Sequence, residues 1–144
     1  MLLLQLFIVS FLNFKNFNGI VETCSGWRLN KYPVLKKFIK GTNGAKLYDK
    51  LKISFVPGHN PDLITTHPLK RTDLTVYKSM GDLHDLFISK GFLPKNDSKS
   101  DLCTIWVEYK MCMNHKRIVE TECNVKCPRR ELWTNELYER LLIN

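Results

Sequence analysis

The segment from Ile20 to Asn30 constrains the fold of this chain more than any other part of the sequence. It begins with the β-type run Ile20–Thr23, continues through the turn pair Ser25-Gly26, and reaches Asn30, a candidate helix N-cap. Cys24 lies between the run and the turn pair. The segment therefore predicts a strand, a tight loop that carries a cysteine, and the start of a helix.

A cysteine at such a junction is a candidate nucleophile. The free backbone N–H groups and the dipole of a helix N-terminus stabilise the thiolate, which is the reactive form of the side chain. Thiol–disulfide enzymes place a second redox residue three positions later, in a C-x-x-C pair. Here that position holds Trp27. An indole has no sulfur and cannot resolve a mixed disulfide, so the loop as written holds a lone thiol. Cys24 and Trp27 are the candidate catalytic residues.

The sequence that follows, up to about residue 96, has an α/β pattern. Apolar residues at helical spacing predict a helix that begins after Asn30 and ends at Gly41. Ser79 and Asp82 form a capping-box-like start for a second helix, which Gly91 ends. Alternating apolar residues and flanking turns predict strands at Leu51–Phe55, Asp62–Thr66 and Leu74–Tyr77.

Several motifs in this region occur in the order found in a known family. They are Asn30–Gly41, Gly58-His59-Asn60-Pro61-Asp62-Leu63, Asp82-Leu83-His84-Asp85-Leu86-Phe87 and Lys90-Gly91-Phe92. From about Ile20 to Lys95 the chain resembles the selenoprotein M and selenoprotein F family. The resemblance implies a thioredoxin-like fold and redox chemistry on thiols and disulfides. The spacing of Cys24 and Trp27 is similar to the Cys-x-x-selenocysteine loop of the M branch.

The tryptophan at the selenocysteine position has two interpretations. Selenocysteine is encoded by UGA, which is one base away from the tryptophan codon UGG and is itself translated as tryptophan in some genetic codes. Trp27 is therefore either a translated UGA, in which case position 27 is selenocysteine, or a true tryptophan. In the first case the pair is a complete redox site. In the second case Cys24 can form only a mixed disulfide that nothing in the loop releases.

The chain divides by composition into three parts. Residues 1–19 are predicted to be a signal peptide, because the apolar run from Met1 to Leu12 has the length of a secretory h-region and is too short to span a bilayer. A first buried strand is the alternative for this run. Residues 20–96 are predicted to form the thioredoxin-like domain, and residues 97–144 a cysteine-containing extension.

The positive charge of the chain indicates a solvated basic surface. The net charge is +8, and residues 1–96 hold all of the excess, with 14 Lys and Arg against 6 Asp and Glu. The lysines are scattered and no aromatic platform lies between them, which argues against a nucleic-acid site.

The extension contains four of the five cysteines, Cys103, Cys112, Cys123 and Cys127. In an oxidising compartment they predict two disulfides in any of three connectivities, which leaves Cys24 unpaired. A zinc site of Cys112, His115, Cys123 and Cys127 is one alternative. A second redox pair, Cys123 and Cys127, is another, because residues 118–123 repeat part of residues 20–24. The extension also predicts a strand at residues 102–109 and an amphipathic helix at residues 131–142.

A few further residues carry weaker expectations. The turn that contains His59 is a candidate neighbour of the redox loop, whereas the sequence around His84 predicts a surface position. Pro61 is a candidate for the cis-proline of thioredoxin-like folds, with Pro57 and Pro68 as alternatives. Asn96 begins an N-x-S sequon in a stretch, residues 94–101, that predicts an exposed linker.

Two functions remain open at this level. The resemblance implies a thiol–disulfide oxidoreductase of the endoplasmic reticulum lumen that acts on folding clients through Cys24 and position 27, with a glycoprotein-folding quality-control partner by analogy with the F branch. The alternative is a redox-silent thioredoxin-like binding module, luminal or secreted, since residues 140–144 contain no retention signal. We expect no cofactor, no nucleic-acid partner and no stable membrane insertion once the signal is cleaved.

Overall fold

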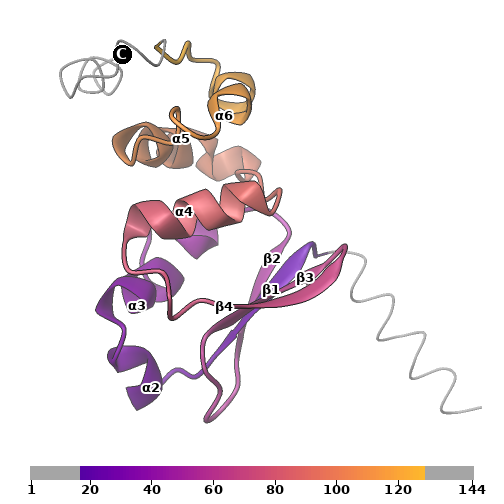
Figure 1. The fold of residues 1–144 in the computed structure, drawn as a ribbon, viewed down its shortest axis with the longest axis vertical. Coiled ribbons are helices and arrows are strands. Elements are labelled where there is room, and N and C mark those ends of the chain that lie inside the picture. The colour runs from indigo at the N-terminus through magenta and orange to yellow at the C-terminus, as the bar shows by residue number, and fades with distance from the viewer. Residues whose placement is uncertain (1–16, 129–144) are drawn as a thin grey trace, which may run out of the picture. The chain divides into compact units, whose positions relative to one another are not determined.

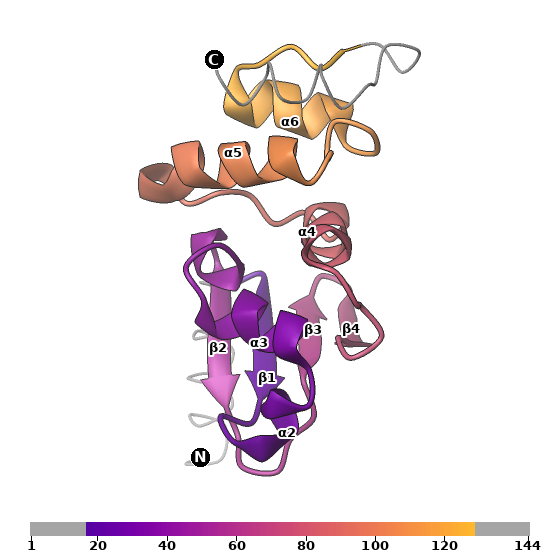
Figure 2. The same ribbon diagram turned by 90° about the vertical axis from the view of Figure 1, so that its left-hand side faces the viewer.

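The computed structural model describes residues 17–128. Figures 1 and 2 show the helices and strands of these residues, coloured along the chain. The residues belong to two compact units, each made of segments that are separated in the sequence. The described part of the first unit is residues 17–33 and 50–76, and that of the second is residues 34–49 and 77–128.

The first unit is built on a four-stranded sheet with the order β2-β1-β3-β4 (Figure 2). The strands are β1 (Gly19–Thr23), β2 (Leu51–Phe55), β3 (Asp62–Thr66) and β4 (Leu69–Asp73). β1 runs parallel to β2 and antiparallel to β3, and β3 and β4 form an antiparallel hairpin. The predicted strands at Leu51–Phe55 and Asp62–Thr66 are confirmed with these bounds.

The two faces of this sheet differ in exposure, as the period of two in a strand requires. Val21 of β1 and its neighbour Leu63 of β3 are fully buried. Glu22 and Asp62, which pair one residue further along, lie on the opposite face and are only partly buried. After β1 the chain passes through residues 24–26 into the short helix α2 (Trp27–Asn30), so the predicted strand and loop are confirmed. The N-cap predicted at Asn30 was wrong, because Asn30 is the last residue of α2 and the helix that ends before Gly41 begins at Pro33.

The second unit consists of helices. They are α3 (Pro33–Lys40), the 3₁₀ turn η1 (Ala45–Leu47), α4 (Met80–Ser89), the 3₁₀ turn η2 (Asn96–Ser98), α5 (Lys99–Glu108) and α6 (Lys116–Cys123). The predicted start of α4 is confirmed, because the Ser79 hydroxyl accepts a hydrogen bond from the Asp82 backbone N–H at 3.0 Å. Gly91 follows this helix with a φ of +87°, a conformation that favours glycine.

A polar relay lies inside the second unit, and His84 is its centre. The Trp106 indole N–H donates to the Tyr48 hydroxyl at 3.0 Å, and the hydroxyl donates to His84 Nδ1 at 2.7 Å. His84 Nε2–H in turn donates to the Asn43 carbonyl at 3.2 Å. Each of these polar groups has a hydrogen-bond partner while His84 is neutral, so the imidazole can be fully buried. The prediction of a surface position for His84 was therefore wrong.

The four cysteines of the extension form two disulfides. Cys103 pairs with Cys123 on α5 and α6, and Cys112 pairs with Cys127. Each cysteine of the zinc alternative is thus in a bridge, and Cys123 and Cys127 belong to different bridges. Neither the zinc site nor the second redox pair is the arrangement found. His115 instead forms an ion pair with Asp85, with Nε2 and Oδ1 2.6 Å apart.

Other local predictions were wrong for identifiable reasons. Residues 102–109 lie in and just after helix α5, because Leu102, Ile105 and Trp106 have helical spacing and are all buried. The strand beside β3 is Leu69–Asp73 rather than residues 74–77, because the hairpin turns at His67-Pro68. Residues 94–101 are structured by η2 and α5 and do not form a free linker.

Some predictions fall outside the described residues. These are residues 1–16 of the signal peptide predicted at residues 1–19, the alternative buried strand in the same run, and the amphipathic helix at residues 131–142. Gly19, the last residue of the predicted signal peptide, lies in β1. Within residues 17–128, none of the helices has the length and apolar character needed to cross a membrane.

Candidate redox site

Cys24 is held at the end of β1 by hydrogen bonds to the turn after β2. Its backbone N–H donates to the His59 carbonyl at 3.1 Å, and the carbonyl of the preceding Thr23 accepts from the Val56 N–H at 2.7 Å. The turn itself is closed by a bond from the His59 N–H to the Val56 carbonyl at 3.2 Å. The loop backbone is therefore fixed on the sheet side, which leaves residues 25–28 to shape the surroundings of the sulfur.

The Cys24 thiol is free, whereas the other four cysteines of the chain are in disulfides. Only 5% of the residue is exposed. Partial burial raises the pKa of the thiol, but hydrogen bonds from the backbone N–H groups of Gly26, Leu29 and Arg28, together with the Arg28 charge, lower the pKa by more. The net direction is downward, so the thiolate is favoured relative to an ordinary cysteine.

Trp27 lies at the start of α2 and is 64% exposed. Two cations face its ring, with Lys31 Nζ 4.6 Å and Arg28 Cζ 5.5 Å from the ring centroid. Such contacts contribute about 0.5–1 kcal/mol each at exposed sites, so they orient the indole without burying it. Position 27 is thus presented to solvent, whereas Cys24 is recessed.

A cavity of about 310 Å³ joins the two candidate site residues. Cys24, Trp27 and Phe55 line it, together with Pro57, Gly58 and residues 25, 26 and 28. The structure therefore brings Cys24 and position 27 to one hollow between the redox loop and the turn after β2. The hollow is of a size to take a side chain next to the sulfur.

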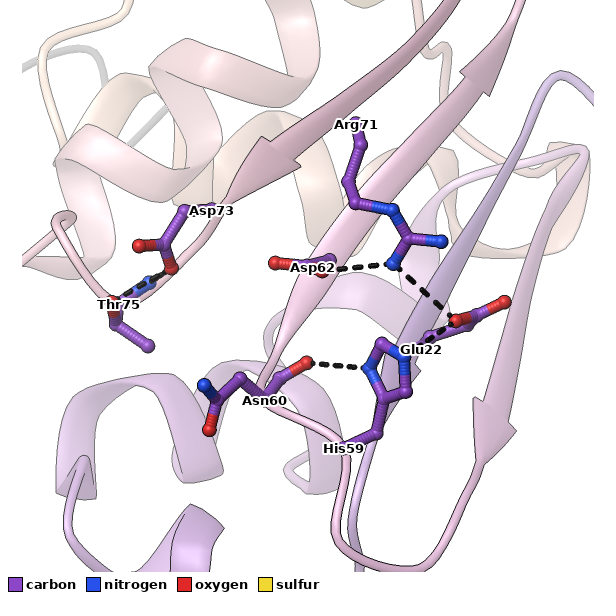
Figure 3. Close-up of polar contacts among 7 residues, drawn as sticks. All are labelled: Glu22, His59, Asn60, Asp62, Arg71, Asp73 and Thr75. Carbon is purple, nitrogen blue, oxygen red and sulfur yellow. Dashed lines mark hydrogen bonds and ion pairs between the residues drawn. The ribbon is translucent and has the colours of Figure 1, made fainter.

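The other sequence candidates lie elsewhere. The His59 side chain is directed to Glu22 on the sheet face, with Nε2 and Oε2 3.4 Å apart, and does not line the cavity (Figure 3). The cis peptide bond found is His67-Pro68, so the hypothesis for Pro61 was wrong. It lies between β3 and β4, next to the β1 end that carries Gly19 and away from Cys24.

Two residues of the site were missed by sequence reasoning. Arg28 contributes both a backbone N–H and a charge to the Cys24 thiol. Its guanidinium donates to the Asn60 side-chain carbonyl, with Nη1 and Oδ1 3.3 Å apart. The two residues are 32 positions apart, and no local pattern in the sequence links them.

Comparison with known proteins finds a related redox domain over the part of the chain that contains this site. Residues 19–67 match the model of the Sep15/SelM redox domain. The chain is similar to selenoprotein M of Eriocheir sinensis, with 35% identity over 80 residues, which are 53% of this chain and 60% of the relative. The chain thus spans about three fifths of the length of this curated relative.

The matched region contains β1, the redox loop, α2, α3, β2 and β3. It therefore includes both candidate redox positions and the turn that holds Cys24. The mixed α/β class and the thioredoxin-like fold of the redox domain are those expected from the sequence, and the two disulfides lie in the extension. Residues 19–67 of this chain are thus similar to the Sep15/SelM redox domain, and the comparisons support a redox domain of this type around Cys24 and position 27.

Proposed function

We propose that this protein is a thiol–disulfide oxidoreductase that acts on the cysteines of folding proteins through Cys24 and position 27. The observation that carries the proposal is the Cys24 thiol. It is free, its pKa is lowered by the backbone of α2 and by Arg28 after the opposing effect of burial, and it lines a cavity with position 27. A lowered pKa and access to a hollow are what distinguish a reactive cysteine from a structural one.

The exposures of the two positions support a division of labour. Position 27 is 64% exposed and Cys24 is 5% exposed. With selenocysteine at position 27, the exposed selenolate attacks a client disulfide and releases one client thiolate. The recessed Cys24 then attacks the selenium, releases the second client thiolate and forms a selenenylsulfide. Two electrons pass to the client, and the enzyme carries the new bond.

With tryptophan at position 27, the second step has no atom to perform it. The Cys24 thiolate can still attack a client disulfide and hold the client in a mixed disulfide. This is the alternative function, a redox-silent binding module, and the orientation of Trp27 by Arg28 and Lys31 favours it, because an ordered exposed aromatic ring is a contact surface. The codon for position 27 distinguishes the two functions.

The compartment is part of the proposal. The two disulfides of the extension support an oxidising compartment, because such bridges are rare in the cytosol. We place the protein in the endoplasmic reticulum lumen, with secretion as the alternative. Folding clients are the proposed partners, and a component of glycoprotein-folding quality control is a further candidate, with the disulfide-bonded extension as its contact region.

The test replaces Trp27 by cysteine. A C-x-x-C spacing at the start of a helix brings the sulfurs of positions 24 and 27 within disulfide reach. We therefore expect the reduced Trp27→Cys protein to cleave a fluorescent disulfide substrate, with formation of an internal disulfide between Cys24 and the new cysteine. Trp27→Ser removes the indole without adding a sulfur and is the matched control. Both Trp27→Ser and the unmodified chain should show almost no turnover.

Equal turnover by the Trp27→Cys and Trp27→Ser proteins would contradict the proposal. It would mean that position 27 is not a redox position and that any activity arises elsewhere in the chain.

A further inference from the structure

The turn between β2 and β3 is attached both to the redox loop and to the sheet. Gly58 has a φ of +74°, a conformation that favours glycine and lets residues 57–60 reverse direction tightly. The His59 carbonyl in this turn accepts the Cys24 backbone N–H at 3.1 Å. The position of the turn therefore sets the position of Cys24.

The side chain of Asn60 connects the same turn to α2. Its carbonyl oxygen accepts a hydrogen bond from Arg28 Nη1 at 3.3 Å. An amide oxygen holds a guanidinium in place without neutralising its charge, in contrast to a carboxylate. Arg28 can then keep its full charge beside the Cys24 sulfur.

The side chain of His59 fixes the turn to the partly exposed face of the sheet (Figure 3). Its Nδ1–H donates to the Asn60 backbone carbonyl at 3.0 Å, and its Nε2 lies 3.4 Å from Glu22 Oε2. Glu22 is in turn 3.5 Å from Arg71 Nη1, which donates to Asp62 at 2.9 Å. Residues from β1, β3 and β4 thus form one ionic network, which holds the imidazole from the sheet side.

We propose that Asn60 and His59 are positioning residues for the Cys24 thiol. Asn60 keeps the Arg28 charge next to the sulfur, and His59 keeps Asn60 and the Cys24 backbone in register with the sheet. The inference rests on the proposed role of Cys24 and deepens it, because it assigns the control of thiolate formation to a turn more than 30 residues away from the loop. None of these residues touches the reacting atoms.

The experiment measures the pH profile of Cys24 alkylation by iodoacetamide in the full chain, because the midpoint of that profile reports the thiol pKa. Asn60→Ala releases Arg28, so we expect the midpoint to rise and the rate at neutral pH to fall, on the order of threefold. Asn60→Asp keeps a partner for Arg28 but neutralises it, and the midpoint should also rise. Asn60→Gln, which retains the amide oxygen, should restore much of the original profile. Asn96→Ala makes the same chemical change at an exposed site in the other unit and is the matched control.

His59 is tested with a conservative and a disruptive substitution. His59→Gln keeps a polar side chain that can reach Glu22 and should leave the profile close to that of the unmodified chain. His59→Ala should raise the midpoint. Adding Asn60→Ala to it should raise the midpoint no further, because both residues act on the thiol through the hydrogen bond between Asn60 and Arg28.

A purely structural role would lower the melting temperature and leave the midpoint in place, and this result in Asn60→Ala or Asn60→Asp would overturn the inference. So would an equal shift in Asn96→Ala. If Asn60→Ala does not fold, Asn60→Asp and His59→Gln still decide the matter.

The two proposals are separable, because the alkylation profile is measured without any exchange activity. A Trp27→Cys protein without turnover would count against the proposed function alone.

Discussion

At the scale of single residues, the redox loop separates reactivity from exposure. Cys24 is recessed at 5% exposure, and the backbone N–H groups of α2 and the Arg28 charge outweigh the effect of burial on its pKa. Trp27 is exposed and is held by cations, three residues later. A recessed thiol with a lowered pKa is suited to attack a selenium or sulfur atom at position 27, or a client sulfur that enters the cavity.

The charge of Arg28 gives a direct prediction. Cys24 should be the one cysteine alkylated in the native, unreduced protein, with a midpoint below that of the same thiol in the unfolded chain. Arg28→Gln should raise this midpoint and slow alkylation at neutral pH about threefold. Lys31→Gln removes the same charge from a side chain that faces the indole, and it should have a smaller effect. A larger effect of Lys31→Gln would show that the nearby field, rather than the specific contact of Arg28, stabilises the thiolate.

At the scale of elements, the two disulfides hold the extension in different ways. Cys112 and Cys127 are 0% and 3% exposed and form a buried bridge, whereas Cys103 and Cys123 are half-buried. The latter pair lines a hollow of about 600 Å³ between α5 and α6, next to the ion pair of Lys99 and Glu122. Thiolate attack requires access to a sulfur, so the two bridges should differ in lability.

We therefore expect stepwise reduction of the native protein. Limited treatment with dithiothreitol, followed by alkylation and peptide mass mapping, should label Cys103 and Cys123 roughly tenfold sooner than Cys112 and Cys127. The same treatment in denaturant removes the difference in access, so both bridges should then open together. Earlier labelling of Cys112 and Cys127 in native protein would contradict this expectation. It would mean that local unfolding of α6 and residues 124–127 exposes the buried bridge faster than dithiothreitol enters the hollow.

At the scale of the whole molecule, stability depends on a buried histidine that stays neutral. Burial lowers the pKa of His84 from 6.5 to about 4, and the hydrogen bond to the Asn43 carbonyl opposes this only in part. The unfolded chain therefore binds a proton between these two values that the folded chain does not. The native state disfavours protonation of His84, so the stability that this group contributes is fully present above about pH 6.5 and is lost as the pH falls toward 4.

The free energy of unfolding should accordingly fall by up to about 3 kcal/mol between pH 6.5 and 4 through this group. Urea denaturation at a series of pH values measures it. His84→Gln keeps an acceptor and a donor for Tyr48 and Asn43 but does not titrate, so it should be less stable near neutral pH and show a flatter dependence. An unchanged slope in the His84→Gln protein would assign the acid sensitivity to the carboxylates instead.

The sequence by itself determined the local elements and the place of the site. The alternation at Leu51–Phe55, the cap at Ser79 and the junction at Cys24 each specify a backbone conformation through neighbours a few residues away, and the structure confirms these elements. The order of motifs also indicated the family, which the match over residues 19–67 supports. The short apolar run at residues 102–109 was ambiguous, because its apolar residues fit both the helical period of 3.6 and the strand period of two. Packing against the rest of the fold then decides between helix and strand.

Tertiary structure decided which distant residues meet. The pairing of the cysteines, the burial of His84 beside Tyr48 and the contact of Arg28 with Asn60 all join residues that are 15 to 36 positions apart. Local periodicity carries no information on such contacts, because each depends on how the chain returns to itself in space. The lowered pKa of Cys24 belongs to both levels: the sequence places the thiol at the start of a helix, and the fold holds the Arg28 charge beside it through a turn far along the chain.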